Sequence, residues 1–218
     1  MRSRSRRVFA AVALLFVLGS CSSDRAAEVS DGGTPTPATT PPTTVPVART
    51  MVMVGDSITN GSETQLREQL ATLDVDVSID AEDGRRMVHD GFTSSGLQAI
   101  QRHVAQRPDL WVIALGTNDV ANLQPPDYLA TINELLAAIP AGAPVLWVDC
   151  YLDGYQDLSE QFDAALRQVL ATRGNARVVD WATVAAEDGV LRDGIHPSGF
   201  GIEEFTRRVS AAVADWSS

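Results

Sequence analysis

The chain contains no lysine: all 17 of its basic residues are arginine, against 28 aspartates and glutamates in 218 residues. Mechanisms that need a lysine nucleophile or a lysine Schiff base are therefore excluded. The formal net charge is −11, and it becomes 13 − 28 = −15 without the four arginines at positions 2, 4, 6 and 7. Because so acidic a protein repels polyanions, we expect neither nucleic acid nor a surface of anionic lipid headgroups as its main partner.

Cysteine is also scarce, since the chain has only Cys21 and Cys150. Cys150 follows an apolar run, and we expect it to be a small buried side chain. If Cys21 carries a lipid, Cys150 has no partner within the chain. An exported protein without a disulfide must then gain its stability from a hydrophobic core.

The first 20 residues are typical of an export signal, because an arginine-rich start precedes an apolar run at Val8–Leu18. That run is too short to span a bilayer. Residues 18–21 (Leu-Gly-Ser-Cys) resemble the lipobox of bacterial lipoproteins, which implies a lipid anchor on Cys21. The alternative is an ordinary cleaved signal with a cysteine nearby. The pair Arg6–Arg7 also resembles the start of a twin-arginine signal, so the export route stays open.

Residues 21–49 are interpreted as the lipidated cysteine followed by a tether. Threonine and proline make up 11 of the 16 residues in 31–46, a composition that favours extended conformations and cannot bury a core. The remaining residues, 50–218, are predicted to form one domain.

From residue 50 onward, short apolar runs alternate with segments of helical periodicity. Continuous apolar runs at Met51–Val54, Leu110–Leu115 and Val145–Val148 are typical of strands covered on both faces. Residues 75–79 alternate between apolar and polar, which indicates an edge strand, and Arg177–Asp180 is a fifth candidate. Apolar side chains recur at helical spacing in five segments, within 66–73, 97–104, 129–139, 158–170 and 202–216. This alternation predicts a three-layer α/β/α sandwich around a five-stranded parallel sheet.

Polar residues follow the first and third predicted strands, at the edge where open parallel sheets bind ligands. Residues 55–57 (Gly-Asp-Ser) precede a helix, so the Ser57 hydroxyl would point into the cleft beside a helix start. Residues 116–119 (Gly-Thr-Asn-Asp) include Asn118, whose amide can donate to an oxyanion. Both Ser57 and Asn118 are also suited to capping a helix, so neither is diagnostic by itself.

Two further motifs lie after the second strand and before the last helix. Gly84 could present a backbone N–H to the same oxyanion, or simply be a turn glycine. Residues 193–197 (Asp-Gly-Ile-His-Pro) place a carboxylate three residues before an imidazole. His196 could accept the serine proton while Asp193 orients it, although a histidine beside a proline can also be structural.

Taken together, the Gly-Asp-Ser motif at 55–57, Gly84, the Gly-Thr-Asn-Asp motif at 116–119 and the Asp-Gly-Ile-His-Pro motif at 193–197 resemble the four ordered blocks of the SGNH hydrolases. These enzymes are also called GDSL-type esterases and lipases. The resemblance spans Met51 to about Trp216 and implies a flavodoxin-like strand order, 2-1-3-4-5.

The resemblance also implies roles for individual residues. Ser57 would be the nucleophile, His196 the general base and Asp193 its orienting partner. The oxyanion would be held by the backbone N–H groups of Ser57 and Gly84 and by the Asn118 side chain. An ester would acylate Ser57, and water or a sugar hydroxyl would then attack the acyl-enzyme.

Other residues support weaker predictions. Tyr151 and Tyr155 follow the fourth strand, so they could line an acyl or sugar pocket or merely cover the core. Arg85 could meet an anionic substrate or lie in a solvated loop. His89 and His103 have no spacing typical of metal ligands, so we expect no metal and no other cofactor.

The leading interpretation is an extracytoplasmic serine esterase, tethered to the bacterial cell membrane, that removes short acyl groups from a cell-envelope glycan, a glycolipid or another small ester. An O-acyltransferase is the first alternative, because Asp80-Ala81 and Gly84-Arg85 also resemble the SGNH domains attached to membrane acyltransferases. A lipoprotein that binds the envelope without catalysis is the second, since a fold does not fix a function.

Overall fold

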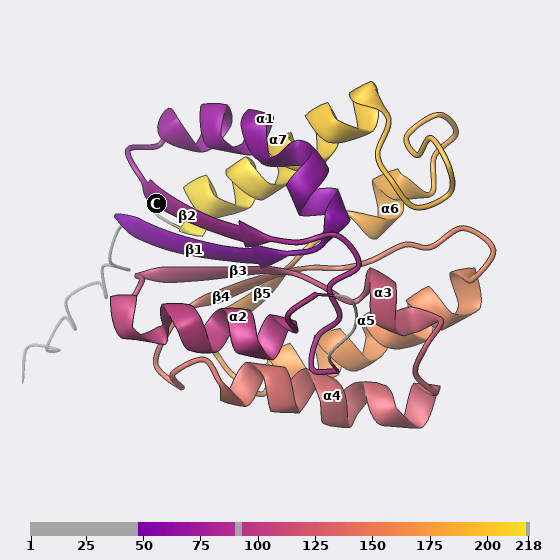
Figure 1. The fold of residues 1–218 in the computed structure, drawn as a ribbon, viewed down its shortest axis with the longest axis horizontal. Coiled ribbons are helices and arrows are strands. Elements are labelled where there is room, and N and C mark those ends of the chain that lie inside the picture. The colour runs from indigo at the N-terminus through magenta and orange to yellow at the C-terminus, as the bar shows by residue number, and fades with distance from the viewer. Residues whose placement is uncertain (1–47, 90–92, 217–218) are drawn as a thin grey trace, which may run out of the picture. The chain divides into compact units, whose positions relative to one another are not determined.

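The computed structural model describes residues 48–89 and 93–216. A five-stranded sheet lies at its centre in the order β2-β1-β3-β4-β5, and every strand pair is parallel (Figure 1). The strands are β1 (Thr50–Gly55), β2 (Asp76–Ala81), β3 (Leu110–Ala114), β4 (Val145–Val148) and β5 (Ala176–Val179). The predicted strand order is confirmed, and so is the edge position of the second strand.

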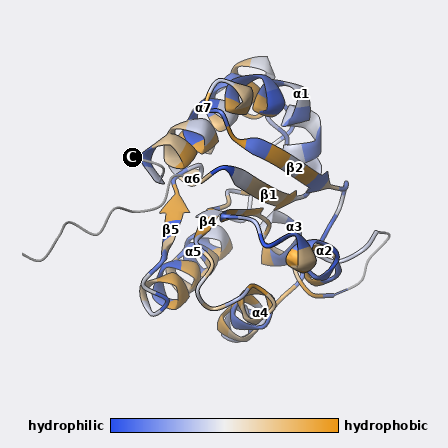
Figure 2. Ribbon diagram, turned by 90° about the vertical axis from the view of Figure 1, so that its left-hand side faces the viewer, coloured by the Kyte–Doolittle hydropathy of each residue, from blue (hydrophilic) through white to orange (hydrophobic). Residues whose placement is uncertain are grey.

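Two layers of helices cover the sheet (Figure 1). On one face, α1 (Ser57–Ala71) packs against α7 (Gly199–Trp216), and on the other, α4 (Pro125–Ala137) packs against α5 (Gln156–Ala171) beside α2 (Gly96–His103). Figure 2 shows the same layers from the side, with α1 and α7 above the strands and α4 and α5 below them. The short elements are α3 (Thr117–Val120), α6 (Ala182–Ala185) and the 3-10 turn η1 (Val104–Gln106).

The central strand β1 is buried on both faces, as its continuous apolar run predicts. Val52 and Val54 pack in the core beneath α2, α4 and α5, whereas Met51 and Met53 pack in the core beneath α1 and α7. None of these four side chains is more than 1% exposed. Because successive side chains of a strand point to opposite faces, one strand joins both cores and fixes the position of the turn that follows it.

The short helices α3 and α6 and the turn η1 were not predicted, because elements of three or four residues are too short to show a period. The predicted tether extends too far at its C-terminal end. Ala48 and Arg49 were included in it because they follow the Thr/Pro-rich stretch, but they belong to the folded domain. Ala48 is buried, and the Arg49 N–H donates to Asp109 Oδ2 at 3.0 Å.

Several predictions about the N-terminal part fall outside the described residues: the signal peptide over 1–20, lipidation of Cys21 and the tether up to residue 47. Within 48–89 and 93–216, no helix has the length and apolar character needed to cross a membrane.

Candidate active site

Ser57 lies on a tight turn between β1 and α1, as the first residue of the helix. A Cβ on Gly55 would overlap the Thr59 side chain, so the turn needs glycine there. Asp56 caps the helix, and its Oδ1 accepts the Ile58 N–H at 3.0 Å. The N–H groups of a first helical turn have no partner within the helix, and this end of a helix stabilises negative charge. The turn therefore puts a hydroxyl and an anion-binding N–H at the same edge of the sheet.

His196 lies within hydrogen-bond distance of both Ser57 and Asp193. Ser57 Oγ is 3.0 Å from His196 Nε2, although 139 residues separate them in the chain. His196 Nδ1 is 2.9 Å from Asp193 Oδ2. With the proton on Nδ1, the Nε2 lone pair faces the hydroxyl and can accept its proton.

Asp193 is held by backbone N–H groups as well as by the imidazole. Its Oδ1 accepts the N–H of His196 at 2.8 Å and that of Ile195 at 3.1 Å. These bonds, the backbone bond from His196 first, lower the pKa of Asp193 to about 2. The carboxylate thus remains charged across the pH range in which an imidazole titrates, and its side chain is 48% exposed.

The loop that carries the histidine is closed on itself and against the segment after β4. Leu191 and Pro197 form an antiparallel bridge across it. The Asp153 N–H donates to the Gly194 carbonyl at 2.9 Å. Gly194 has φ +83°, and a Cβ there would lie 3.0 Å from the Asp153 Cβ, so a larger residue would push the two segments apart. These backbone contacts therefore hold the loop that carries His196 in one position.

The three predicted oxyanion donors come from three separate loops. Gly84 has φ +72° in the loop after β2, and its position is exposed. Asn118 Nδ2 donates to Asp56 Oδ2 and to the Arg85 carbonyl, both at 3.2 Å. Asp56 precedes Ser57 and Arg85 follows Gly84, so the amide lies between the residues that carry the other two donors. Because both Nδ2 bonds are long, one can be exchanged for a stronger bond to an oxyanion.

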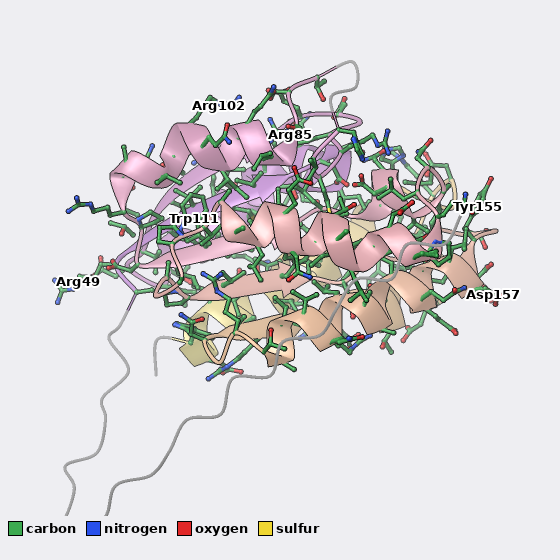
Figure 3. The ribbon with its side chains drawn as sticks, turned by 90° about the horizontal axis from the view of Figure 1, so that it is seen from below. Arg49, Arg85, Arg102, Trp111, Tyr155 and Asp157 are labelled. Atoms are coloured by element: carbon green, nitrogen blue, oxygen red, sulfur yellow. The ribbon has the colours of Figure 1, made fainter. Side chains whose placement is uncertain are left out.

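Arg85 neither faces a substrate nor lies in a solvated loop, so both interpretations of this residue from the sequence are wrong. Its side chain is fully buried and donates to the Gly55 carbonyl at 3.1 Å, to Asp80 Oδ1 at 2.8 Å and to the Ser94 carbonyl at 3.1 Å. It also forms an ion pair with Glu82 at 3.0 Å. Figure 3 shows Arg85 inside the molecule, whereas Arg102 of α2 lies at the surface. The role of Arg85 in the structure is to fix the Gly84 loop against the end of β1.

Two buried carboxyl groups under the loops were not singled out from the sequence. Asp119 Oδ2 accepts the Met87 N–H at 3.0 Å, and Asp119 Oδ1 lies 3.5 Å from Arg86 Nε. These two contacts connect the loop after β3 to the loop after β2. Burial raises the pKa of Asp119 to about 6 and that of Asp56 to about 7. Asp56 and Asp119 are each next to a predicted site residue in the sequence. That position does not show that their side chains point into the protein.

Tyr151, Tyr155 and Cys150 have different surroundings in the structure. Tyr151 is partly buried and lines a cavity between α5 and α6. Tyr155 is 48% exposed and stands near Asp157 at the outer end of α5 (Figure 3). Cys150 is buried as predicted, and burial raises the pKa of its thiol well above the usual value. A thiol kept protonated is a poor nucleophile.

The other two histidines, His89 and His103, do not belong to a group of potential metal ligands. His103 Nε2 lies 3.0 Å from Asp80 Oδ2, and His89 is exposed. No group of three or more histidine, cysteine or acidic side chains poised for a metal occurs in the part of the chain that the structure describes.

Comparison with known proteins places the chain in a family. Residues 53–203 match the model of the GDSL-like lipase/acylhydrolase family, and the chain belongs to that family. The match covers most of the folded domain, from β1 to the start of α7. No curated protein matches the chain.

Solved structures share the fold at low sequence identity. The catalytic domain of the peptidoglycan O-acetyltransferase OatA from Streptococcus pneumoniae, a methylsulfonyl adduct, has a TM-score of 0.60 at 17% identity over 78% of this chain and 95% of that one. A protein from Desulfitobacterium hafniense assigned to the lipolytic G-D-S-L family has a TM-score of 0.58 at 17% identity, over 75% and 98%. A family 3 carbohydrate esterase from Clostridium thermocellum has a TM-score of 0.55 at 14% identity, over 78% and 98%.

Proposed function

We propose that the protein is a serine acyl hydrolase that cleaves carboxylic esters through an acyl-enzyme on Ser57. The observation that carries the proposal is the 3.0 Å contact between Ser57 Oγ and His196 Nε2, with Asp193 Oδ2 2.9 Å from the other ring nitrogen. Membership of an acylhydrolase family supports the same reaction class.

In the first half of the reaction, Ser57 Oγ attacks the ester carbonyl while His196 Nε2 takes its proton. The negative charge on the carbonyl oxygen is received by the N–H groups of Ser57 and Gly84 and by the Asn118 amide. His196 then protonates the leaving alcohol, and the carbonyl re-forms as an acyl-serine. In the second half, His196 deprotonates a water that attacks the acyl group, which releases the acid and restores Ser57.

The substrate class we propose is a short acyl ester on a cell-envelope glycan or glycolipid. Two of the structural relatives are described as acting on carbohydrate: a carbohydrate esterase and a peptidoglycan O-acetyltransferase. Their low identity supports the fold alone, so the glycan remains a proposal for this chain.

We also propose that the enzyme works outside the cytoplasm, attached to the bacterial membrane through a lipid on Cys21. The support is in the sequence alone: the apolar run Val8–Leu18, the Leu-Gly-Ser-Cys motif at 18–21 and the Thr/Pro-rich stretch within 21–49. Mass spectrometry of the membrane fraction tests it, because lipidation predicts a diacylglyceryl mass on Cys21 that the Cys21→Ser variant lacks.

An O-acyltransferase is the second candidate, favoured by the structural likeness to the OatA domain. It differs only in the second half-reaction, where a sugar hydroxyl replaces water as the group that His196 deprotonates. A binding lipoprotein without catalysis is a third candidate, and the close contact of Ser57 with His196 argues against it.

Hydrolysis of p-nitrophenyl acetate by the domain without its first 47 residues tests the proposal. We expect turnover in the wild type and in Thr64→Ala, an exposed position of α1, and none above background in Ser57→Ala. Adding a glycan acceptor separates the candidates. Release of acetate supports the hydrolase, acetyl transfer to the glycan supports the transferase, and glycan binding without turnover supports the binding lipoprotein.

A further inference from the structure

A cavity of about 440 Å³ opens between α5 and α6, beyond the end of β4. Its walls come from the segment after β4, from one side of α5 and from α6. The volume lies within the range of small-ligand sites in proteins. None of the residues assigned to the acyl transfer lines it.

Buried polar bonds hold the cavity walls in place. Asp149, at the end of β4, accepts the N–H groups of Trp181 and Ala182 at 2.7 Å each, which fixes the start of α6. Its other oxygen pairs with Arg167 of α5 at 2.7 Å. Asp163 of α5 accepts the Cys150 N–H at 3.1 Å. Because both helices are bonded to the end of one strand, the cavity exists before a ligand arrives, which lowers the entropic cost of binding.

The cavity adjoins the loop that carries the catalytic histidine. Tyr151 lines it and also a smaller neighbouring cavity, of about 170 Å³, which extends to Gly194 between Asp193 and His196. Gln156, which lines the larger cavity, donates from Nε2 to the Tyr151 hydroxyl at 3.3 Å and to Oδ1 of Asp153, which lines the smaller one, at 2.8 Å, so hydrogen bonds connect the walls of the two spaces. In the sheet, β3 separates β4 from β1, which puts the end of β4 about 10 Å from the end of β1. That distance suits a ligand with more than one ring, esterified at one end.

The lining favours a neutral, hydroxyl-rich ligand. It offers the Tyr151 ring, the Gln156 amide and the Thr183 hydroxyl, beside the carboxyl groups of Glu160 and Asp163. Burial raises the pKa of Asp163 to about 7, so near neutral pH this group can donate as well as accept a hydrogen bond. The cation of the lining, Arg167, is already paired with Asp149. An anionic ligand would therefore meet net negative charge.

We propose that the cavity between α5 and α6 binds a neutral sugar unit of an oligosaccharide whose ester, on another unit, lies at Ser57. The inference rests on the proposed function and adds a substrate class to it. The sugar ring packs against Tyr151, and its hydroxyls bond to Gln156, Thr183 and Asp163. Binding energy from this remote unit then holds the ester beside the nucleophile.

Filling the cavity tests the proposal. Ala186 lines it from an exposed position beside α6, so Ala186→Trp would occupy it, and Ala211→Trp on the exposed surface of α7 is the matched control. The substrates are p-nitrophenyl acetate, acetylated xylotriose as the neutral sugar ester and acetylated tri-galacturonate as the anionic one. We expect Ala186→Trp to lower kcat/KM for acetylated xylotriose at least tenfold, mainly through KM, with p-nitrophenyl acetate turnover and all Ala211→Trp values unchanged. In the wild type, the neutral ester should be preferred to the anionic one by a similar factor.

The outcomes separate this inference from the proposed function. If p-nitrophenyl acetate is hydrolysed but Ala186→Trp leaves the xylotriose ester unaffected, or slows both substrates equally, the sugar site is refuted while the hydrolase stands. If no ester is hydrolysed, the proposed function fails. The site is then judged by NMR titration with xylotriose: amide shifts at Gln156 and Thr183 that Ala186→Trp abolishes would support it, and their absence at millimolar sugar would overturn it.

Discussion

Replacing Asp193 by asparagine changes one atom of the carboxylate but reverses the hydrogen bonding of the histidine. The new amide can keep its oxygen on the N–H groups of Ile195 and His196, where Asp193 Oδ1 now accepts bonds of 3.1 and 2.8 Å. The amide nitrogen then faces His196 Nδ1, which must become the acceptor. The imidazole proton moves to Nε2, towards Ser57, and the ring can no longer take the serine proton.

The expected loss follows from the exposure of the group. Where the triad aspartate is buried, the same change costs about 10⁴ in kcat. The Asp193 side chain is 48% exposed, so water can partly compensate for the lost carboxylate. We therefore expect kcat to fall about 10³-fold, equivalent to about 4 kcal/mol in the barrier.

The assay is p-nitrophenyl acetate hydrolysis between pH 5 and 9, with Asp157→Asn at the exposed start of α5 as the matched control. The control should match the wild type in activity, and urea unfolding should show that Asp193→Asn is still fully folded under the assay conditions. Because the pKa of Asp193 is lowered to about 2, the acid limb of the wild-type profile cannot come from this group. A kcat for Asp193→Asn within tenfold of wild type would refute the assigned role.

Three other changes give independent tests. Asn118→Ala should reduce kcat/KM for p-nitrophenyl acetate by 10²- to 10³-fold, or about 3–4 kcal/mol, and a loss under threefold would remove Asn118 from the oxyanion site. The pKa of Asp56 is raised from 3.8 to about 7, so between these values the folded state keeps a proton that the unfolded state has released, and the free energy of unfolding falls as pH rises. For this group alone the fall is on the order of 4 kcal/mol. Urea unfolding at pH 4.5 and 7.5 should show a smaller fall in Asp56→Asn, and equal falls would contradict the burial of a carboxyl group there. Arg85→Met leaves two carboxylates and three carbonyls without their buried donor and should cost about 3–5 kcal/mol, against at most about 1 kcal/mol for the exposed Arg67→Met. Equal urea midpoints for these two variants would show that Arg85 is not the support of the Gly84 loop.

The sheet could be predicted because its strands carry strong local signals. The runs at Met51–Val54 and Val145–Val148 are apolar without interruption, a pattern typical of strands covered on both faces. The strand order came from the family resemblance, since periodicity alone does not say which strands are neighbours. The short helices α3 and α6 were missed, because they depend on tertiary contacts rather than on a repeating apolar face.

Within the site, the sequence indicated which residue types were present but not which way they point. Arg85 is the clearest case: a charged residue in a loop beside a glycine is usually solvated, yet here acceptors on four neighbouring residues compensate for its burial. Asp56 is similar, because a helix cap is ordinarily exposed, whereas this one is 1% exposed beside Asn118. Such compensation arises from residues far apart in the chain, so no local pattern contains it.

The proposed catalytic triad of Ser57, His196 and Asp193 is tested most directly by covalent labelling. The domain is treated with phenylmethanesulfonyl fluoride and its peptides are analysed by mass spectrometry. We expect one sulfonyl group on Ser57, formed at a rate that falls at least a hundredfold in His196→Gln, with esterase activity lost in step with labelling. A label on another residue, or an undiminished rate of Ser57 labelling in His196→Gln, would show that the imidazole 3.0 Å away does not activate the serine.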